Sequence, residues 1–265
     1  MPFISKIIIL IILIFPTSIF AAFEDKILGS RAQGLGGAFT ALANDYNAIY
    51  YNPAGLGKLI LPTLSSNYQS LFNLPPLRNQ SLSLTLPLKK HQTLALDIQF
   101  FGKDLYQEKC LSLSYALSLS KNSYLGLNIK WLRLEIFEAG KVSSTGIDLG
   151  FLYEATKNLS FGLMVKNINQ PFLGESLPLN YRVGLKLDLN PAAIFVSDLD
   201  SHQRIYMGIE LYLDQGFIIR NGFLTKPQRY TLGLGIKKKR VFLDYALVSH
   251  PVLSFTNQFS LTMVF

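Results

Sequence analysis

The sequence predicts an all-β fold: a 14-stranded antiparallel transmembrane β-barrel with an N-terminal plug in its lumen. From about residue 61 to the end, apolar and polar residues alternate in short segments. Hydrophobic residues make up 49% of the chain and charged residues only 16%, yet no apolar run beyond the N-terminus approaches the roughly 20 residues of a membrane helix. The last residue, Phe265, is aromatic and closes an alternating segment. The apolar excess leaves two choices, a large soluble β-core or a barrel with its apolar face in lipid.

Residues 1–22 have the parts of a secretory signal peptide. Lys6 precedes an apolar run at 7–15, Pro16 ends that run, and small residues follow at 18–22. The alternative, a short membrane anchor, is disfavoured because the apolar run is too short to span a bilayer comfortably. We expect export across an inner membrane and cleavage after Ala21 or Ala22.

Residues 23–58 are expected to form the plug. Within Gly29–Gly57 glycine is frequent and no strand alternation occurs. Gly36 and Gly37 permit close contact with a barrel wall, residues 38–43 are expected to form a short helix, and Arg31 is expected to pair with a lumenal carboxylate. The candidate plug and gate residues are Arg31, Gly34, Gly36, Gly37, Asn44, Asp45, Asn52, Pro53, Ala54 and Gly55. The alternative for each is plug packing without a ligand contact.

Residues 59–265 are expected to form the barrel. Fourteen strands are predicted at 61–68, 80–88, 92–101, 110–119, 123–136, 143–154, 159–167, 179–189, 192–199, 204–212, 216–224, 228–236, 241–248 and 254–265. In residues 81–88, for example, four leucines share one face while Ser81, Ser83 and Thr85 share the other. A soluble sandwich would pair the apolar faces, whereas a membrane barrel turns them to lipid.

Connection lengths favour the membrane barrel. Six alternate turns are short, whereas the connections at 69–79, 102–109, 167–178 and 197–203 are longer, as expected of periplasmic turns and extracellular loops. The clean strands also carry no charge on the apolar face. A change of phase at Trp131 and Leu132 suggests a β-bulge. In the last strand, Phe259, Leu261, Met263 and Phe265 share one face and are expected to be the signal for the barrel-assembly machinery.

The ordered elements Gly29–Ala32, Gly34–Phe39, Ala43–Asp45 and Tyr50–Leu56 resemble the N-terminus of PorV/PorQ-type outer-membrane proteins, relatives of the FadL-like (long-chain fatty-acid transporter) superfamily. Over the rest of the chain the resemblance is architectural. It implies a bacterial outer-membrane location, a fourteen-stranded barrel and an internal hatch in which the Asn-Pro-Ala element is Asn52–Ala54.

Two functions follow from the resemblance and stay open at this point, beside a third reading, a structural barrel without an assigned role. The first is passage of hydrophobic or amphipathic small molecules through the plugged lumen. Movement of the plug would open the path, which could leave laterally through the wall at a bulge such as the one expected near Trp131. The second is a role in type IX secretion, with a secreted protein bound at the surface. The apolar loops at 71–77 and 170–177 suit either function, as a ligand entry or a partner contact, and the residues concerned are Leu71, Phe72, Leu74, Phe172 and Leu173.

Other function classes have little support in the sequence. The three histidines fall in predicted turns, and neither a serine-nucleophile motif nor metal-ligand spacing occurs, so we expect no enzyme, metal or cofactor. The net charge of +8 comes largely from turn lysines, which does not suggest nucleic-acid binding. Cys110 has no partner for an internal disulfide. The expected partners are therefore outer-membrane lipid, the assembly machinery, and small apolar molecules or secreted proteins.

Overall fold

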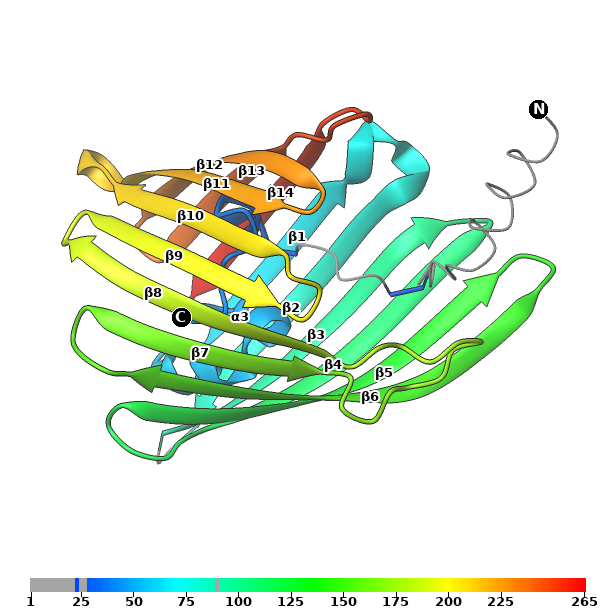
Figure 1. Ribbon diagram of the computed structural model, residues 1–265, viewed down its shortest axis with the longest axis horizontal. Helices are drawn as coiled ribbons and strands as arrows, with labels where there is room; N and C mark the ends of the chain where they lie inside the picture. The colour runs from blue at the N-terminus through cyan, green and yellow to red at the C-terminus, as the bar shows by residue number, and fades with distance from the viewer. Residues whose placement is uncertain (1–21, 24–27, 89–90) are drawn as a thin grey trace, which may run out of the picture.

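The chain folds into a closed barrel of fourteen antiparallel strands (Figure 1). The computed structural model describes residues 22–23, 28–88 and 91–265, so the predicted leader at 1–21 lies outside the described residues. The strands are β1 (Thr63–Ser70), β2 (Arg78–Leu88), β3 (Gln92–Lys103), β4 (Tyr106–Ser118), β5 (Ser123–Ile136), β6 (Gly140–Glu154), β7 (Leu159–Lys166), β8 (Asn180–Asn190), β9 (Ala193–Asp200), β10 (Ile205–Tyr212), β11 (Phe217–Thr225), β12 (Gln228–Lys238), β13 (Val241–Val248) and β14 (Thr256–Val264). Each strand pairs with its neighbours in sequence, and β1 pairs with β14 to close the ring. The predicted fold class and all fourteen strands are confirmed.

The outer face of the barrel is apolar and the inner face is polar. On β2, Leu82 and Leu86 point outward and are 51% and 41% exposed, whereas Ser83 and Thr85 point inward and are fully buried. A soluble sandwich would bury those leucine rows, so the pattern is that of a membrane barrel. Within the described part of the chain, no helix is long and apolar enough to cross a bilayer.

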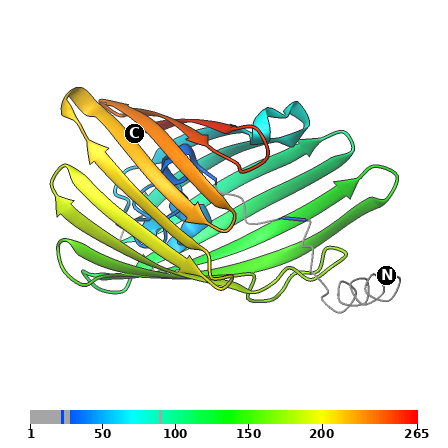
Figure 2. The ribbon, with the colours of Figure 1, turned by 45° about the horizontal axis from the view of Figure 1, so that its top comes forward.

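Strands β3–β6 are longer than the rest. They have 12 to 15 residues, whereas the other ten strands have 8 to 11. The long strands project past the others at the end of the barrel away from the C-terminus (Figures 1 and 2). The long connection expected at 102–109 was therefore wrong: β3 and β4 continue their pairing up to Lys103 and Tyr106, which leaves only Asp104 and Leu105 in the turn.

The bulge expected at Trp131 and Leu132 is also wrong. Strand β5 pairs without a break to β4 and β6 across both residues. Trp131 points outward and is 42% exposed, while Leu132 points inward and is 3% exposed. The change of phase arose because the inner face of β5 carries leucines here. Among the described residues, the register shift of the sheet lies between Asp188 and Asn190, where β8 meets β9.

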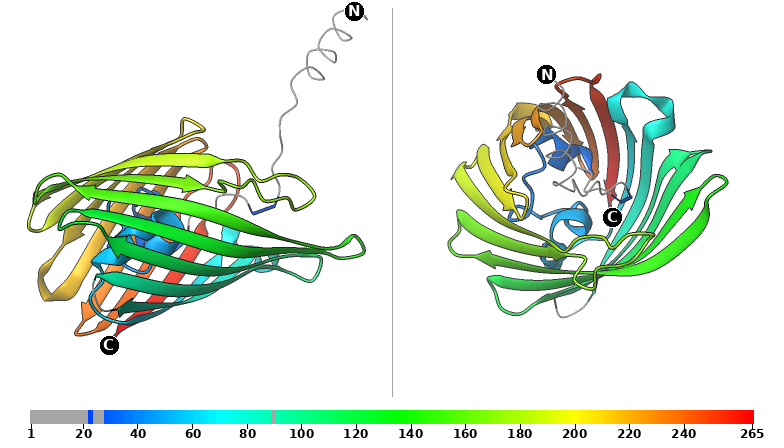
Figure 3. Two further views of the ribbon diagram at one scale, coloured as in Figure 1. Left: turned by 90° about the horizontal axis from the view of Figure 1, so that it is seen from below. Right: turned by 45° about the vertical axis from the view of Figure 1, so that its right-hand side comes forward.

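Residues 28–58 lie inside the ring of strands (Figure 3). They contain the short helices α2 (Ser30–Gly34) and α3 (Ala48–Tyr51) and the 3-10 helix η1 (Pro53–Lys58). The short helix expected at 38–43 was wrong: residues 40–42 form a turn, because a wall carboxylate takes the backbone N–H groups of Phe39 and Thr40. Outside the barrel, η2 (Leu71–Asn73) and η3 (Pro75–Leu77) form the β1–β2 connection and η4 (Asp214–Gly216) the β10–β11 turn.

Candidate functional site

Glycines on the inner wall let the plug backbone touch the sheet directly. Three cross-strand pairs occur, Gly126 with Gly150, Gly162 with Gly184, and Gly208 with Gly222. A Cβ atom added at Gly126 would lie 2.2 Å from the backbone N of Ala54. Side chains at such positions would push the plug away, so the plug and the wall are fitted to each other.

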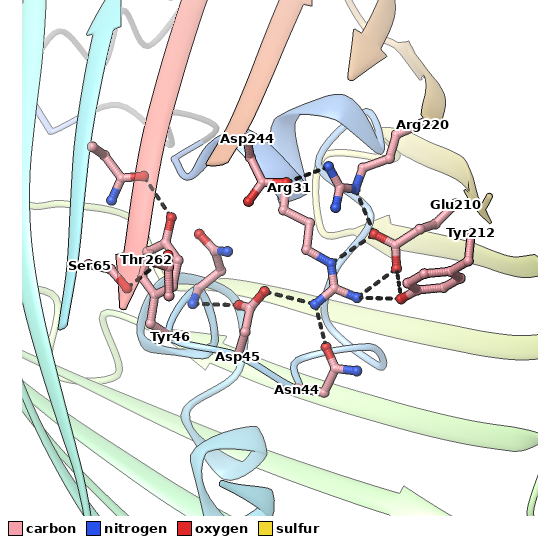
Figure 4. A network of polar contacts seen from close by, with 12 residues as sticks. Arg31, Asn44, Asp45, Tyr46, Ser65, Glu210, Tyr212, Arg220, Asp244 and Thr262 are labelled. Carbon is pink, nitrogen blue, oxygen red and sulfur yellow. Dashed lines mark hydrogen bonds and ion pairs between the residues drawn. The ribbon is translucent and has the colours of Figure 1, made fainter. Parts of the chain in front are cut away.

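Arg31, on α2, is the centre of a buried ion network between plug and wall (Figure 4). Its Nε and Nη2 donate to the two carboxylate oxygens of Glu210 on β10, at 2.8 and 2.7 Å. Its Nη1 donates to Asn44 Oδ1 at 2.7 Å and to Asp45 Oδ2 at 2.8 Å, both within the plug. Sequence reasoning expected a lumenal carboxylate for Arg31, and the structure identifies it as Glu210.

The wall extends the same network. Arg220 on β11 donates from Nε to Glu210 Oε2 at 2.6 Å and from Nη1 to Asp244 Oδ1 at 2.7 Å. Glu210 and Arg220 are 0% and 1% exposed. Burial lowers the pKa of Arg31, but electrostatic attraction to Glu210, Tyr212 and Asp45 and the hydrogen bond to Glu210 raise it well above its ordinary value, so the guanidinium stays charged. Because buried ions are costly without partners, each of these groups depends on the others.

Asp198, on β9, holds the turn that follows α2. Its Oδ2 accepts the backbone N–H groups of Phe39 and Thr40 at 2.9 and 3.0 Å and the Thr40 hydroxyl at 2.7 Å. Thr231 on β12 makes a similar contact, accepting from the Gly36 N–H and donating to the Gly34 carbonyl, both at 3.0 Å. Sequence reasoning missed Asp198 because residues 192–196 before it are all apolar, so alternation does not show whether Asp198 faces the lumen or the lipid.

The Asn52–Gly55 element forms a third contact between plug and wall. The Asn52 Nδ2 donates to the carbonyls of Thr40 and Phe151, at 2.8 and 2.9 Å, and its Oδ1 accepts from the Ala54 N–H. Pro53 lies against Gly150, and Gly55 lies so close to the Ala43 carbonyl that an added Cβ would be 1.8 Å from it. The asparagine thus joins two parts of the plug to β6.

Tyr50, on α3, anchors the other side of the plug. Its hydroxyl donates to Asp97 Oδ1 on β3 at 2.8 Å and lies 3.0 Å from the Ser81 hydroxyl. Burial and the negative charge of Asp97 raise the pKa of Tyr50 well above its ordinary value. The phenol therefore keeps its proton and remains a donor. The plug is held from β3, β6, β9, β10 and β12, which surround it.

A cavity of about 390 Å³ lies between the plug and the ends of the long strands. Plug residues Leu28, Ile49 and Tyr50 line its inner end. Its side walls alternate between apolar groups, such as Phe101, Leu132 and Leu177, and charged groups, such as Glu108, Lys130 and Arg204.

The charged groups of the cavity have partners on the protein. Lys130 pairs with Asp148 at 2.7 Å, Arg204 pairs with Asp200 at 2.6 Å, and Glu108 accepts from the Tyr106 hydroxyl at 2.8 Å. The lining therefore combines apolar surface with charged groups that are already paired within the protein.

The two apolar loops play different parts. Leu173 is 2% exposed and packs with Leu177, Leu132 and Leu134 beside the cavity, whereas Phe172 in the same loop is 60% exposed.

The loop at 71–77 contributes no residue to the cavity lining. Phe72 instead bonds through its N–H to the Thr256 hydroxyl and stacks edge-on with His250. Leu71 is partly exposed and Leu74 is 46% exposed. These three side chains therefore lie apart from this cavity, and their role as a ligand or partner contact stays a prediction.

The proposed assembly signal lies on the outer face. Phe259, Leu261 and Met263 on β14 and the terminal Phe265 are 53%, 37%, 39% and 56% exposed. Their contact with assembly machinery stays a prediction. Among the described residues, no group of three histidine, cysteine, aspartate or glutamate side chains is placed to hold a metal ion.

No protein-family model matches the chain, and no curated protein matches it in sequence. Solved structures do match in fold. The Ralstonia pickettii toluene transporter TbuX superposes with a TM-score of 0.74 at 12% identity, covering 90% of this chain and 98% of that one. The CymD monoaromatic hydrocarbon channel gives 0.69 at 14% identity, with 90% and 97% covered. A Pseudomonas aeruginosa FadL homologue gives 0.68 at 10% identity, with 89% and 98% covered. At these identities the likeness establishes the shared barrel fold.

Proposed function

We propose that this chain is an outer-membrane barrel of the FadL-like superfamily that admits hydrophobic or amphipathic small molecules through its plugged lumen. The observation that carries the proposal is the cavity of about 390 Å³ above the plug, which has both apolar and hydrogen-bonding walls. Proteins of the same fold, among them a toluene transporter and a monoaromatic hydrocarbon channel, support the assignment.

In this proposal the plug is the gate. Molecules reach the cavity past the β7–β8 loop, and the plug contacts at Glu210, Asp198 and Asn52 close the way inward. Strand β5 pairs without a break with β4 and β6, so there is no gap between strands near Trp131 for a lateral exit. Passage therefore needs a displacement of part of the plug.

Filling the cavity tests the proposal. Ser112, on β4, is 3% exposed and lines the cavity, while its neighbour Leu113 points outward and is 51% exposed. We expect Ser112→Trp to reduce uptake of a fluorescent fatty-acid-like amphiphile into proteoliposomes at least tenfold. The matched variant Leu113→Trp adds the same group on the lipid side and should leave uptake unchanged. Equal uptake by the two variants, with both barrels folded, would refute the proposal.

A second candidate is the type IX secretion role implied by the PorV/PorQ resemblance. The observation that favours it is the pair of exposed apolar side chains at the tips of the long hairpins, Leu105 (68% exposed) and Phe137 (63% exposed). The Phe137 N–H donates to the Leu105 carbonyl, so the two tips are adjacent. In this role, Leu105→Ser with Phe137→Ser should abolish capture of a secreted protein's C-terminal domain and leave amphiphile uptake unaltered.

A further inference from the structure

A cluster of basic side chains lies on the outer face of the long strands. Lys109 on β4 and Arg133 on β5 are direct cross-strand partners, as are Glu135 on β5 and Lys141 on β6. Glu135 Oε1 lies 2.9 Å from Lys109 Nζ and 2.8 Å from Arg133 Nε, and Glu135 Oε2 lies 3.9 Å from Lys141 Nζ. Three cations share one carboxylate, so the cluster has an excess of positive charge.

Strand alternation shows that the cluster faces away from the lumen. Lys109 has the same facing as Leu111, which is 39% exposed, and Arg133 has the same facing as Trp131, which is 42% exposed. The inward neighbours Cys110, Leu132 and Leu134 are buried. The side chains of the cluster retain solvent access, from 33% for Lys109 and Arg133 to 62% for Lys141.

The position of the cluster along the barrel matches the level of lipid headgroups. From Leu111 on β4 to Leu119, which follows the last residue of β4, every second residue is apolar and outward-facing. The eight steps between these two leucines, at about 3.4 Å each on a strand tilted by about 40°, span roughly 21 Å along the barrel axis. That length approaches the apolar band of about 25 Å on membrane barrels. Lys109 and Arg133 come one outward position later, just beyond the band, with Trp131 at its edge as an interfacial aromatic.

The basic cluster is suited to bind anionic groups. The Arg133 guanidinium and two ammonium groups provide several donors, and an arginine fork binds a phosphate with two parallel hydrogen bonds. Charges at the headgroup level are desolvated less than charges in the apolar band, so the three cations remain available to a phosphate. The apolar surface below the cluster, with Leu111 and Trp131, would accept the acyl chains of the same molecule.

We propose that Lys109, Arg133 and Lys141 bind the phosphate groups of an outer-leaflet glycolipid of the lipid A type, whose acyl chains lie on the outer wall below Trp131. Such a glycolipid carries phosphate groups on its sugars and several acyl chains beneath them. The phosphates would meet the row of cations, and the acyl chains would lie on the apolar outer wall next to it. The inference depends on the proposed outer-membrane location and not on the proposed transport.

Native mass spectrometry of the delipidated barrel in detergent tests this inference. The lipids are bisphosphorylated lipid A, the same lipid A after dephosphorylation, and phosphatidylglycerol. We expect the wild-type barrel to bind the bisphosphorylated form at least tenfold more tightly than either of the others. The variant Lys109→Gln/Arg133→Gln/Lys141→Gln should lose this preference. Heat-modifiable migration on gels confirms that each variant is folded.

The control variant is Lys237→Gln/Lys238→Gln/Lys239→Gln, which removes the same charge at the other end of the barrel, where β12 turns into β13. It should retain the preference for bisphosphorylated lipid A. Equal loss in both triple variants, or no loss in either, would overturn the assignment. Phosphatidylglycerol bound as tightly as bisphosphorylated lipid A would overturn the choice of glycolipid. Amphiphile uptake is measured separately, so failure here is distinguishable from failure of the transport proposal.

Discussion

Adding one methyl group to the barrel wall at Gly126 should displace the plug. A Cβ atom there would lie 2.2 Å from both the Ala54 N and the Pro53 carbonyl carbon, which are backbone atoms and cannot rotate aside. Overpacking of this kind costs about 1–3 kcal/mol. Since each 1.4 kcal/mol changes an equilibrium constant tenfold, the displaced form of the plug should become about 5- to 150-fold more populated in Gly126→Ala.

Hydrogen exchange of the plug amides measures this change. Gly146→Ala is the matched control, because its Cβ would meet side-chain atoms and no plug backbone: the flexible end of Lys130 at 3.1 Å, then Leu132 Cδ1 and Pro171 Cγ at 3.4 and 3.5 Å. We expect faster exchange across residues 48–56 in Gly126→Ala, with wild-type exchange in Gly146→Ala and unchanged exchange in the strands of both. If the two variants exchange alike in the plug, the tight fit between plug and wall does not hold the gate closed and the reasoning fails.

Three further variants test other contacts. Arg31→Met leaves Glu210 paired with Arg220 but removes the buried bidentate pair between Arg31 and Glu210. Breaking such a pair costs about 3–5 kcal/mol, so the plug should open more often and conductance in planar bilayers should rise. Wild-type conductance would contradict a role of this ion pair in holding the plug. Asp198→Asn weakens the charge-assisted hydrogen bonds to Phe39 and Thr40, each worth about 1.5–3 kcal/mol. Proteolysis of the turn at 40–42 should therefore be faster in the folded barrel. An unaltered cleavage rate would contradict the role of Asp198 in holding this turn. Phe265→Ser should lower the amount of folded barrel in the outer membrane several-fold while refolding in detergent proceeds normally; normal membrane levels would remove the assembly signal.

The strands were predictable because strand alternation has a fixed period. Residues 81–88 give the same facing in the sequence as in β2, and the even spacing of such segments gave all fourteen strands. The failures had local causes. At Trp131 the inner face becomes apolar because it lines a cavity, and alternation alone treats that change as a bulge. The turn at 40–42 depends on Asp198, more than 150 residues away, which no local pattern reveals.

The site was predictable in part. The glycines and Asn52 stood out by composition, and the need of Arg31 for a carboxylate follows from the cost of burying its charge. The choice of Glu210 among the inward acids depends on the register of the barrel. The cavity could not be predicted, because it results from the extra length of β3–β6 and the path of the β7–β8 loop.

A structure determined in native outer-membrane lipid tests the central claim most directly, namely that the space above the plug binds small apolar or amphipathic molecules. The account predicts lipid-like or ligand density between Phe101, Leu132 and Leu177, with the plug contacts at Glu210 intact. A cavity filled only by water, together with a secreted protein bound at Leu105 and Phe137, would contradict it.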